Sequence, residues 1–254
     1  MQNMKLVSGY EMPMLGLGTW DLRGTACKQA IKEALALGYT HIDTAWMYQN
    51  QRAIGDALQE ARIDRSRLFI TSKVWHTHLH YDGVLEICEE TLRDLQTAYV
   101  DLFLIHWPND AVPMAETFRA LQRIFEEGKA RNIGVSNFTV DHLKEAERVS
   151  EVAVSVNQIR YHVGTEKWDV LRWCQDHGIV VTAYSPLGKG RMLQDPVLTE
   201  VAERHGKTSA QVALRWLVQQ GMVVIPKASS RAHLQENMDV FEWALSPEEI
   251  SAFA

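Results

Sequence analysis

Short apolar segments alternate with helical patterns along almost the whole chain of 254 residues. In residues 25–37, Ala30, Ile31 and Ala34 recur at helical spacing, and Gly38 can end the helix because glycine tolerates a left-handed backbone. The same alternation predicts strands at 14–19, 40–43, 68–74, 100–106, 131–135, 153–157, 179–183 and 222–225. Predicted helices occupy 25–37, 50–61, 81–97, 113–127, 139–149, 166–176 and 231–240. Eight strand-helix units predict an α/β protein with a closed (β/α)8 TIM barrel.

Two of the predicted strands, 100–106 and 179–183, are nearly continuous apolar runs, as expected when both faces of a strand are buried. The rival architecture is an open doubly wound sheet, which often carries a glycine fingerprint for dinucleotides. Gly16 and Gly18 match its first two glycines, but Asp21 stands where the third is required. The failed fingerprint favours the barrel.

Three further features accompany the predicted barrel. A hairpin around Ser8 and Gly9 precedes it and is expected to cap it. An extra helix lies between strands seven and eight, because helical patterns cover both 196–205 and 208–220. Near the C-terminus, Ser246 is placed to cap a last helix. No compositional break divides the chain, so we expect a single domain over residues 1–254.

The net charge is −6 and the basic residues are scattered, which gives no footprint for nucleic acid. Cys27, Cys88 and Cys174 are far apart and form no C-x-x-C pair, so neither a disulfide framework nor a zinc cluster is expected. The N-terminus lacks a signal-peptide pattern, and no apolar run approaches a membrane span. We therefore expect a cytoplasmic monomer without nucleic-acid or membrane partners.

Alternating histidines at His76, His78 and His80 could share a face and bind a metal. They lie in a predicted loop with no nearby cysteine or acidic triad. We predict that they are solvated or face the substrate, and that the protein holds no metal.

Polar residues at the carboxyl ends of the strands are the first candidates for an active site in a barrel. Asp43, Lys73 and His106 end three consecutive predicted strands, which lie side by side about 5 Å apart, so their side chains converge. Tyr48 follows in the loop after Asp43. Taken singly, a lysine at a strand end is usually solvated and a lone histidine is usually structural. Their convergence favours a catalytic site.

A phenol has a pKa near 10 and is a poor proton donor at neutral pH, but a neighbouring ammonium favours the phenolate. We expect Lys73 to lower the pKa of Tyr48, while Asp43 holds Lys73 and keeps it charged. Tyr48 could then protonate a carbonyl oxygen as hydride reaches the carbonyl carbon, with His106 orienting the substrate. This arrangement suits the reduction of carbonyl compounds.

The chain resembles the aldo-keto reductase family in motifs that run in the family's order over most of its length. The motifs are GLGTW at 16–20, IDTA at 42–45, the tyrosine at 48, TSKVW at 71–75, DLFLIHWP at 101–108, GVSNF at 134–138, NQ at 157–158, AYSPL at 183–187 and IPK at 225–227. The resemblance implies that Asp43, Tyr48, Lys73 and His106 are the catalytic tetrad, with Tyr48 as general acid. Tyr48 and His106 also border the substrate.

The resemblance also implies a nicotinamide cofactor. Ser136, Asn137 and Gln158 match the residues that bind the nicotinamide carboxamide, and Tyr184 matches the ring that stacks on nicotinamide. Further residues at the cofactor would be Thr19, Asp43, Ser185, Leu187, Lys227, Ser229, Ser230, Arg231, Glu236 and Asn237. Tryptophans that would form an apolar wall for the substrate are Trp20, Trp46, Trp75 and Trp107.

Two departures from the family pattern bear on cofactor and substrate. Ala228 and His233 stand where many relatives have a hydroxyl and an arginine for the 2′-phosphate, yet Lys227 and Arg231 still offer two cations. We therefore favour NADPH, with NADH also used. The sequence stops where relatives usually continue into a loop that lines the substrate pocket, so that loop is expected to be short or absent and the specificity loose.

Two other functions compete with NADPH-dependent reduction of aldehydes and ketones, including dicarbonyls and sugar-derived carbonyls. Lys73 could form a Schiff base in an aldolase, although this leaves Tyr48 and Tyr184 unexplained. The chain could also be a non-catalytic nucleotide sensor or subunit, but all four tetrad positions are intact.

Overall fold

The computed structural model describes residues 2–253 and contains one parallel sheet in the order β10-β9-β8-β7-β6-β5-β4-β3. The strands are β3 (Leu17–Gly18), β4 (His41–Asp43), β5 (Phe69–Val74), β6 (Leu102–Ile105), β7 (Ile133–Ser136), β8 (Val154–Arg160), β9 (Val180–Tyr184) and β10 (Val223–Ile225). The backbone N–H of Gly16 donates to the carbonyl of Val224 at 2.9 Å, and the N–H of Val224 donates to the carbonyl of Met14 at 2.8 Å. These bonds close the sheet, which confirms the predicted (β/α)8 barrel.

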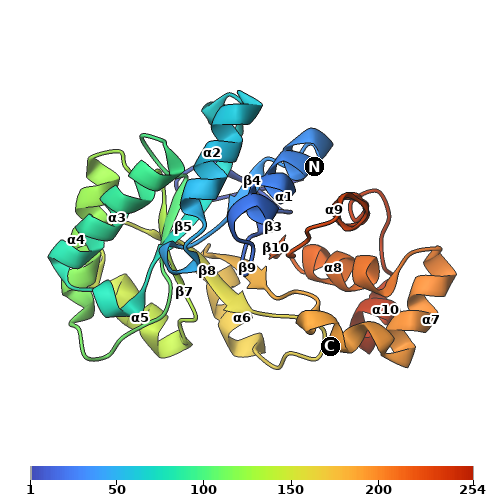
Figure 1. The fold of residues 1–254 in the computed structure, drawn as a ribbon. Helices are drawn as coiled ribbons and strands as arrows, with labels where there is room; N and C mark the ends of the chain where they lie inside the picture. The colour runs from blue at the N-terminus through green and yellow to red at the C-terminus, as the bar shows by residue number, and fades with distance from the viewer. Residues whose placement is uncertain (1, 254) are drawn as a thin grey trace.

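Helices surround the strands (Figure 1). They are α1 (Gly24–Leu37), α2 (Gln51–Ala61), α3 (Tyr81–Leu95), α4 (Met114–Glu126), α5 (Val140–Val149), α6 (Trp168–Asp176), α7 (Pro196–His205), α8 (Ser209–Gln219), α9 (Arg231–Met238) and α10 (Pro247–Ala252). Short 3-10 helices are η1 (Trp46–Tyr48), η2 (Arg65–Arg67), η3 (His76–His78) and η4 (Gly188–Gln194). Both α7 and α8 lie between β9 and β10, which confirms the extra helix. Gly38 ends α1 with a φ of 97°, as predicted.

The N-terminal hairpin, β1 (Asn3–Lys5) and β2 (Glu11–Pro13), seals one end of the barrel. Its residues Leu6 and Met12 belong to a small apolar cluster whose other buried members all come from barrel strands. Phe69 and Leu102, at or near the amino ends of their strands, are among those members. Because no helix residue takes part, this cluster is the interior of the barrel, and the hairpin caps its amino-terminal end.

Side chains on alternate strand residues point into the barrel, and these interior rows change from apolar to polar along each strand. On β5 the row runs from Phe69 through Thr71 to Lys73, and on β6 it runs from Leu102 to Leu104 and ends at His106 just after the strand. The interior is therefore apolar next to the hairpin and polar at the carboxyl ends, where a barrel builds its active site.

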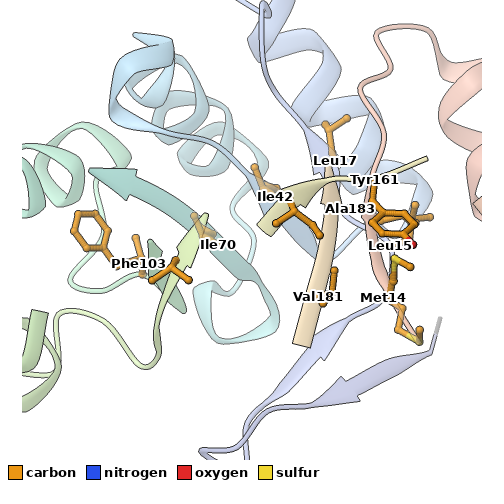
Figure 2. Packing of buried hydrophobic residues seen from close by; sticks show 14 of the residues in the cluster. Met14, Leu15, Leu17, Ile42, Ile70, Phe103, Tyr161, Val181 and Ala183 are labelled. Carbon is orange, nitrogen blue, oxygen red and sulfur yellow. The ribbon is translucent and has the colours of Figure 1, made fainter. Parts of the chain in front are cut away.

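The other residues of the same strands point outward against the helices. Ile70 and Phe103 belong to a larger apolar cluster that also includes Ile87 of α3 and Leu121 of α4. Figure 2 shows some of the residues of this cluster, among them Ile42, Ile70 and Phe103 on the strands. Burial on both faces explains why the strands are nearly continuous apolar runs in the sequence.

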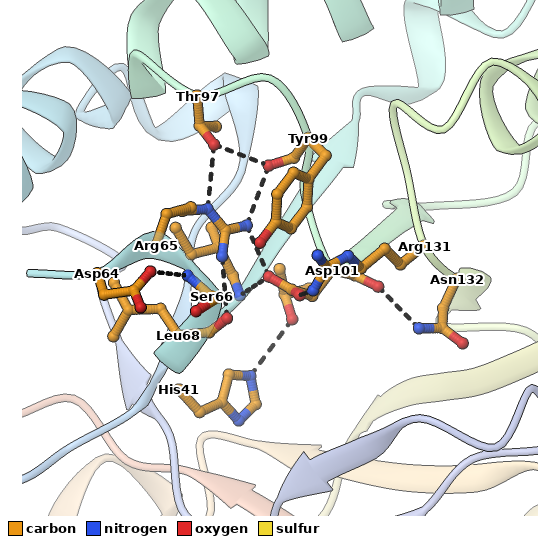
Figure 3. A network of polar contacts seen from close by, with 12 residues as sticks. His41, Asp64, Arg65, Ser66, Leu68, Thr97, Tyr99, Asp101, Arg131 and Asn132 are labelled. Atoms are coloured by element: carbon orange, nitrogen blue, oxygen red, sulfur yellow. Dashed lines mark hydrogen bonds and ion pairs between the residues drawn. The ribbon is translucent and has the colours of Figure 1, made fainter.

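A polar network joins β5, β6 and the segment before β7 at their amino-terminal ends (Figure 3). The buried carboxylate of Asp101 accepts from the Arg65 guanidinium at 2.6 Å and from the backbone N–H of Ile70 at 2.9 Å. Arg131 approaches the other carboxylate oxygen at 3.3 Å, and Asn132 donates to the Asp101 carbonyl at 3.0 Å. This network lies at the opposite end of the barrel from the tetrad and therefore contributes to stability.

Several predicted boundaries differ from the structure, and three of them show why. The helix predicted over 81–97 ends at Leu95 because Gln96 adopts a left-handed φ of 54°. The strand predicted over 100–106 is confined to Leu102–Ile105. Strand β8 continues three residues beyond its predicted end, to Arg160, because those residues keep pairing with β9.

Candidate active site

The centre of the candidate site is an ion pair between neighbouring strands. Lys73 of β5 donates to Asp43 of β4, with 2.6 Å between Nζ and Oδ1, and the two side chains are 0% and 3% exposed. The Lys73 ammonium also donates to the carbonyl of Thr44 at 2.9 Å. Burial lowers the pKa of Lys73, and Asp43 opposes that shift. The predicted contact between Asp43 and Lys73 is therefore present.

Gln158 completes the surroundings of the Asp43 carboxylate from across the barrel. Its Nε2 donates to Asp43 Oδ2 at 2.7 Å, so the two carboxylate oxygens each accept from a different side chain. A buried carboxylate needs such partners, because an unpaired one costs several kcal/mol. Gln158 thus connects the tetrad to a residue predicted at the cofactor.

Tyr48 lies at the end of η1 with its ring among three other site residues. The ring centroid is 5.1 Å from Lys73 Nζ, 5.6 Å from the centre of the His106 ring and 4.9 Å from the centre of the Trp20 ring. Within residues 2–253 the Tyr48 hydroxyl accepts and donates no hydrogen bond. The structure therefore brings all four tetrad residues together and leaves the phenol without a protein partner.

The prediction that Lys73 lowers the pKa of Tyr48 is wrong for this structure. Burial raises the pKa of the Tyr48 phenol, and the Asp43 carboxylate raises it further. The reason is that the Lys73 charge is paired with Asp43, while the phenol is partly removed from water. Tyr48 therefore keeps its proton throughout the neutral pH range.

His106 follows β6 and is neutral. Burial lowers the pKa of its imidazole to about 2, and the charges of Lys73 and His76 act in the same direction. Its Nδ1 atom is buried and has no hydrogen-bond partner among the described residues. A neutral imidazole offers one N–H donor and one acceptor, which suits hydrogen bonding to a carbonyl substrate.

Residues predicted at the nicotinamide form one hydrogen-bonded group beside the tetrad. Ser136 Oγ donates to the Gln158 carbonyl at 2.7 Å, and Asn137 Nδ2 donates to Ser136 Oγ at 3.0 Å and to the His106 carbonyl at 3.1 Å. The Tyr184 hydroxyl donates to Asn137 Oδ1 at 3.0 Å. The Thr19 hydroxyl donates to the Asp43 carbonyl at 2.9 Å and so joins β3 to the same group.

The predicted phosphate-side residues are spread over the segments after β9 and β10. Ser185 follows β9, and Lys227 and Ser229 are exposed after β10. Ser230 caps α9, and Leu187 is partly buried.

Three of these predicted residues already have protein partners. Arg231 pairs with Glu33 of α1 at 2.8 Å, and Glu236 accepts from the Thr208 hydroxyl at 2.5 Å. Asn237 is buried and lies beside the phenol of Tyr39, whose hydroxyl donates to the Leu234 carbonyl at 2.9 Å. The structure thus groups the residues predicted at the nicotinamide but does not join the phosphate-side residues to one another.

The four predicted substrate tryptophans differ in their surroundings. Trp20 and Trp107 are 50% and 42% exposed, which is unusual for such large apolar side chains. The Trp75 ring lies edge-on to His106 at 4.9 Å, whereas Trp46 lies edge-on to His78 at 4.8 Å and packs against the core. Trp20 and Trp75 therefore touch the tetrad directly.

Asn50, which holds two loops together over the site, was not predicted as a site residue. Asn50 Nδ2 donates to the carbonyls of Thr19 and Leu22 at 2.9 and 3.0 Å, and its Oδ1 accepts from the Thr44 hydroxyl at 2.7 Å. Asn50 thereby fastens the loop after β3 to the loop that carries Tyr48. Its sequence signal was only that an asparagine precedes a helix, which is common at N-caps.

No group of three or more histidine, cysteine or acidic side chains within residues 2–253 is arranged to hold a metal ion. Nor does any helix in that range combine the length and apolar character that a membrane crossing requires.

Comparison with known proteins decides the family. The profile of the Aldo/keto reductase family matches residues 14–254. This chain belongs to that family. It is 41% identical to the glyoxal reductase of Bacillus subtilis, over 97% of this chain and 90% of the relative. It is 38% identical to the 9,11-endoperoxide prostaglandin H2 reductase of Trypanosoma cruzi, over 96% and 88%.

A solved structure agrees with this assignment. The fold is similar to that of the aldose reductase from Schistosoma japonicum, with a TM-score of 0.95, 35% identity, and coverage of 100% of this chain and 91% of that one. As a member of the aldo/keto reductase family, the chain is an NAD(P)H-dependent oxidoreductase that reduces carbonyl compounds.

Proposed function

We propose that the protein reduces aldehydes and ketones to alcohols with NADPH, and that Tyr48 donates the proton. The observation that carries this proposal is the surroundings of the Tyr48 hydroxyl. The phenol is protonated, lies beside neutral His106 and has no protein partner within residues 2–253. A carbonyl oxygen in reach of Tyr48 and His106 would receive hydrogen bonds from both.

The chain's own residues divide the work in this proposal. Tyr48 holds the proton and gives it to the oxygen as negative charge develops there. The paired Lys73 ammonium, 5.1 Å from the Tyr48 ring centre, offsets part of the cost of forming a buried phenolate, although burial and Asp43 keep the net pKa of Tyr48 raised. His106 orients the carbonyl as a neutral hydrogen-bonding group.

The donor set beside the tetrad fits a nicotinamide. Asn137 and Gln158 carry side-chain amides and Ser136 carries a hydroxyl, which together supply the donors and acceptors that a primary carboxamide needs. The half-buried Tyr184 ring offers a face for stacking. When bound, the reduced nicotinamide supplies the hydride that adds to the carbonyl carbon.

We propose NADPH as the preferred cofactor on grounds of charge. Lys227 is exposed and makes no ion pair in the described part of the chain, so it is available to a 2′-phosphate. Arg231 is also exposed but is paired with Glu33 at 2.8 Å, which weakens its contribution. Of the two cations after β10, Lys227 is unpaired and Arg231 is not, which predicts a modest preference, with NADH also used.

The proposed substrates are small aldehydes and ketones, including dicarbonyls and sugar-derived carbonyls. The glyoxal reductase of Bacillus subtilis, a relative at 41% identity, supports the dicarbonyl part of this range. The Trp20 ring against Tyr48 and the Trp75 ring against His106 support an apolar wall for the substrate.

Tyr48→Phe tests the proposal. Turnover with NADPH should fall by about 10²–10⁴-fold, the usual contribution of general acid catalysis, while cofactor affinity stays within about twofold. Folding should be unaffected, because the lost hydroxyl has no protein partner in residues 2–253. Tyr10→Phe, on the exposed hairpin, is the control variant. Near-normal turnover of Tyr48→Phe would reject the proton-donor role.

The two competing functions make different predictions in the same assay. An aldolase needs an accessible neutral lysine, whereas Lys73 is fully buried and bound to Asp43 and Thr44. A nucleotide sensor would bind NADPH but oxidise it with no member of a panel of aldehydes, ketones and dicarbonyls. Oxidation of NADPH by any of them rejects the sensor.

A further inference from the structure

Strand β8 carries a charged residue at the top of its interior row. Val156 belongs to the interior apolar cluster, and Gln158 reaches across the barrel to Asp43. Side chains alternate along a strand, so Arg160, two residues after Gln158, is on the same inward side. Arg160 is therefore placed where the interior of the barrel opens to solvent.

The neighbouring strand places Arg160 beside the site. Its register partner on β9 is Tyr184, which lies in the interior row above Val180 and Thr182. Burial raises the pKa of the Tyr184 phenol, and the Arg160 guanidinium opposes that shift, as a cation close to the ring does. Arg160 thus lies at the mouth of the site, next to the ring expected to stack on nicotinamide.

Arg160 is the unbalanced charge at this mouth. It is exposed, and it has no ion pair or hydrogen bond to any side chain of residues 2–253. The other charged groups of the site cancel, because Lys73 is paired with Asp43 and His106 is neutral. An anion that entered the site would find a guanidinium whose donors are not already used.

We propose that Arg160 binds the carboxylate of the substrate and gives the enzyme a preference for oxo acids over neutral aldehydes of the same size. This inference rests on the proposed carbonyl reductase function. Arg160 acts here as a specificity-determining residue. It takes no part in proton transfer, because Gln158 lies between Arg160 and Asp43 in the interior row of β8, and Tyr184 lies beside Arg160 on β9.

The other anion that could meet Arg160 is the phosphate of the cofactor. Cations suited to that task are already present after β9 and β10, where the phosphates are expected. Lys189, Arg191 and Lys227 are all exposed and make no ion pairs among the described residues. Arg160 lies instead at the end of β8, beside the part of the site expected to bind the nicotinamide. Its guanidinium is therefore available to the substrate.

A matched substrate pair tests the assignment. Succinic semialdehyde carries a carboxylate, and its methyl ester has the same aldehyde without the charge. Arg160→Gln should lower kcat/KM for the acid by about tenfold, mainly through KM, and change the ester by less than about twofold. Arg160→Lys should lose about threefold on the acid, because lysine keeps the charge but not the two-pronged geometry.

The control variant is Arg172→Gln, which removes an exposed arginine on α6 that makes no ion pair in residues 2–253. It should leave both substrates unchanged. Raised ionic strength should reduce the acid-to-ester ratio of the wild type and not that of Arg160→Gln.

Four results would overturn the inference. The first is an equal loss on acid and ester in Arg160→Gln. The second is a rise in the NADPH dissociation constant with the acid-to-ester ratio unchanged, which would assign Arg160 to the cofactor phosphate. A wild type that reduces the ester but not the acid would reject the inference and leave the proposed function standing. A wild type that reduces no carbonyl would reject both.

Discussion

The Asp43–Lys73 pair allows a quantitative test, because both side chains are buried. Lys73→Met keeps the length of the side chain and removes its charge, which leaves a carboxylate that is 3% exposed with Gln158 as its one side-chain donor. Removing one partner of a buried ion pair costs about 3–5 kcal/mol of unfolding free energy. Asp43→Asn should cost less, because Lys73 can release its proton, a step that burial already favours.

The double variant Asp43→Asn/Lys73→Met should recover much of this loss. It contains no buried charge, and its main remaining cost is the Thr44 carbonyl left without its donor, about 1–2 kcal/mol. The two substitutions should therefore be non-additive by about 2–4 kcal/mol. Turnover should stay low in all three variants, because the charge beside Tyr48 is lost in each.

Urea unfolding followed by tryptophan fluorescence measures these free energies. Lys207→Met is a matched control, since Lys207 and Asp239 are also 2.6 Å apart but are 22% and 49% exposed. That surface pair should contribute less than about 1 kcal/mol. The reasoning is refuted if Lys73→Met costs no more than this control, or if the double variant is as unstable as the sum of the single variants.

Two further predictions concern buried polar groups. Gln158→Leu leaves Asp43 Oδ2 without a donor, so urea unfolding of the cofactor-free protein should show a loss of about 1–3 kcal/mol in unfolding free energy. An unchanged urea midpoint would contradict this prediction. His41 is fully buried, and burial lowers the pKa of its imidazole to about 4. The imidazole therefore takes up a proton at higher pH in the unfolded chain than in the folded protein. The free energy of unfolding accordingly falls as the pH drops from about 6.5 toward 4. His41→Asn should therefore lose about 2 kcal/mol less than the wild type between pH 7 and pH 5, and an equal loss in both proteins would contradict the assignment.

Local patterns in the sequence were enough to predict the order of the helices and strands. Helical spacing around Ala30 and the glycine at Gly38 predicted α1, and the structure ends that helix at the same glycine. Such patterns work because an amphipathic helix or a doubly buried strand repeats along the chain with the period of its own backbone. The convergence of Asp43, Lys73 and His106 followed from the same source, since parallel neighbouring strands bring their carboxyl ends together.

Boundaries were less predictable where pairing between distant segments decides them. Strand β8 runs on to Arg160 because its last residues bond to β9, and nothing in their own sequence required that. Arg160, at the mouth of the candidate site, was not predicted as a site residue for this reason. A period-two row from Val156 through Gln158 was the signal that could have found it.

Protonation states and side-chain partners were decided by the tertiary structure alone. The sequence suggested a phenol made more acidic by Lys73, whereas burial and Asp43 raise the pKa of Tyr48. Gln158 reaches Asp43 across 115 residues of chain. Arg231 is paired with Glu33 from the other end of the sequence. Periodicity shows which face of an element is buried, but the depth of burial and the charges nearby exist only once the barrel has closed.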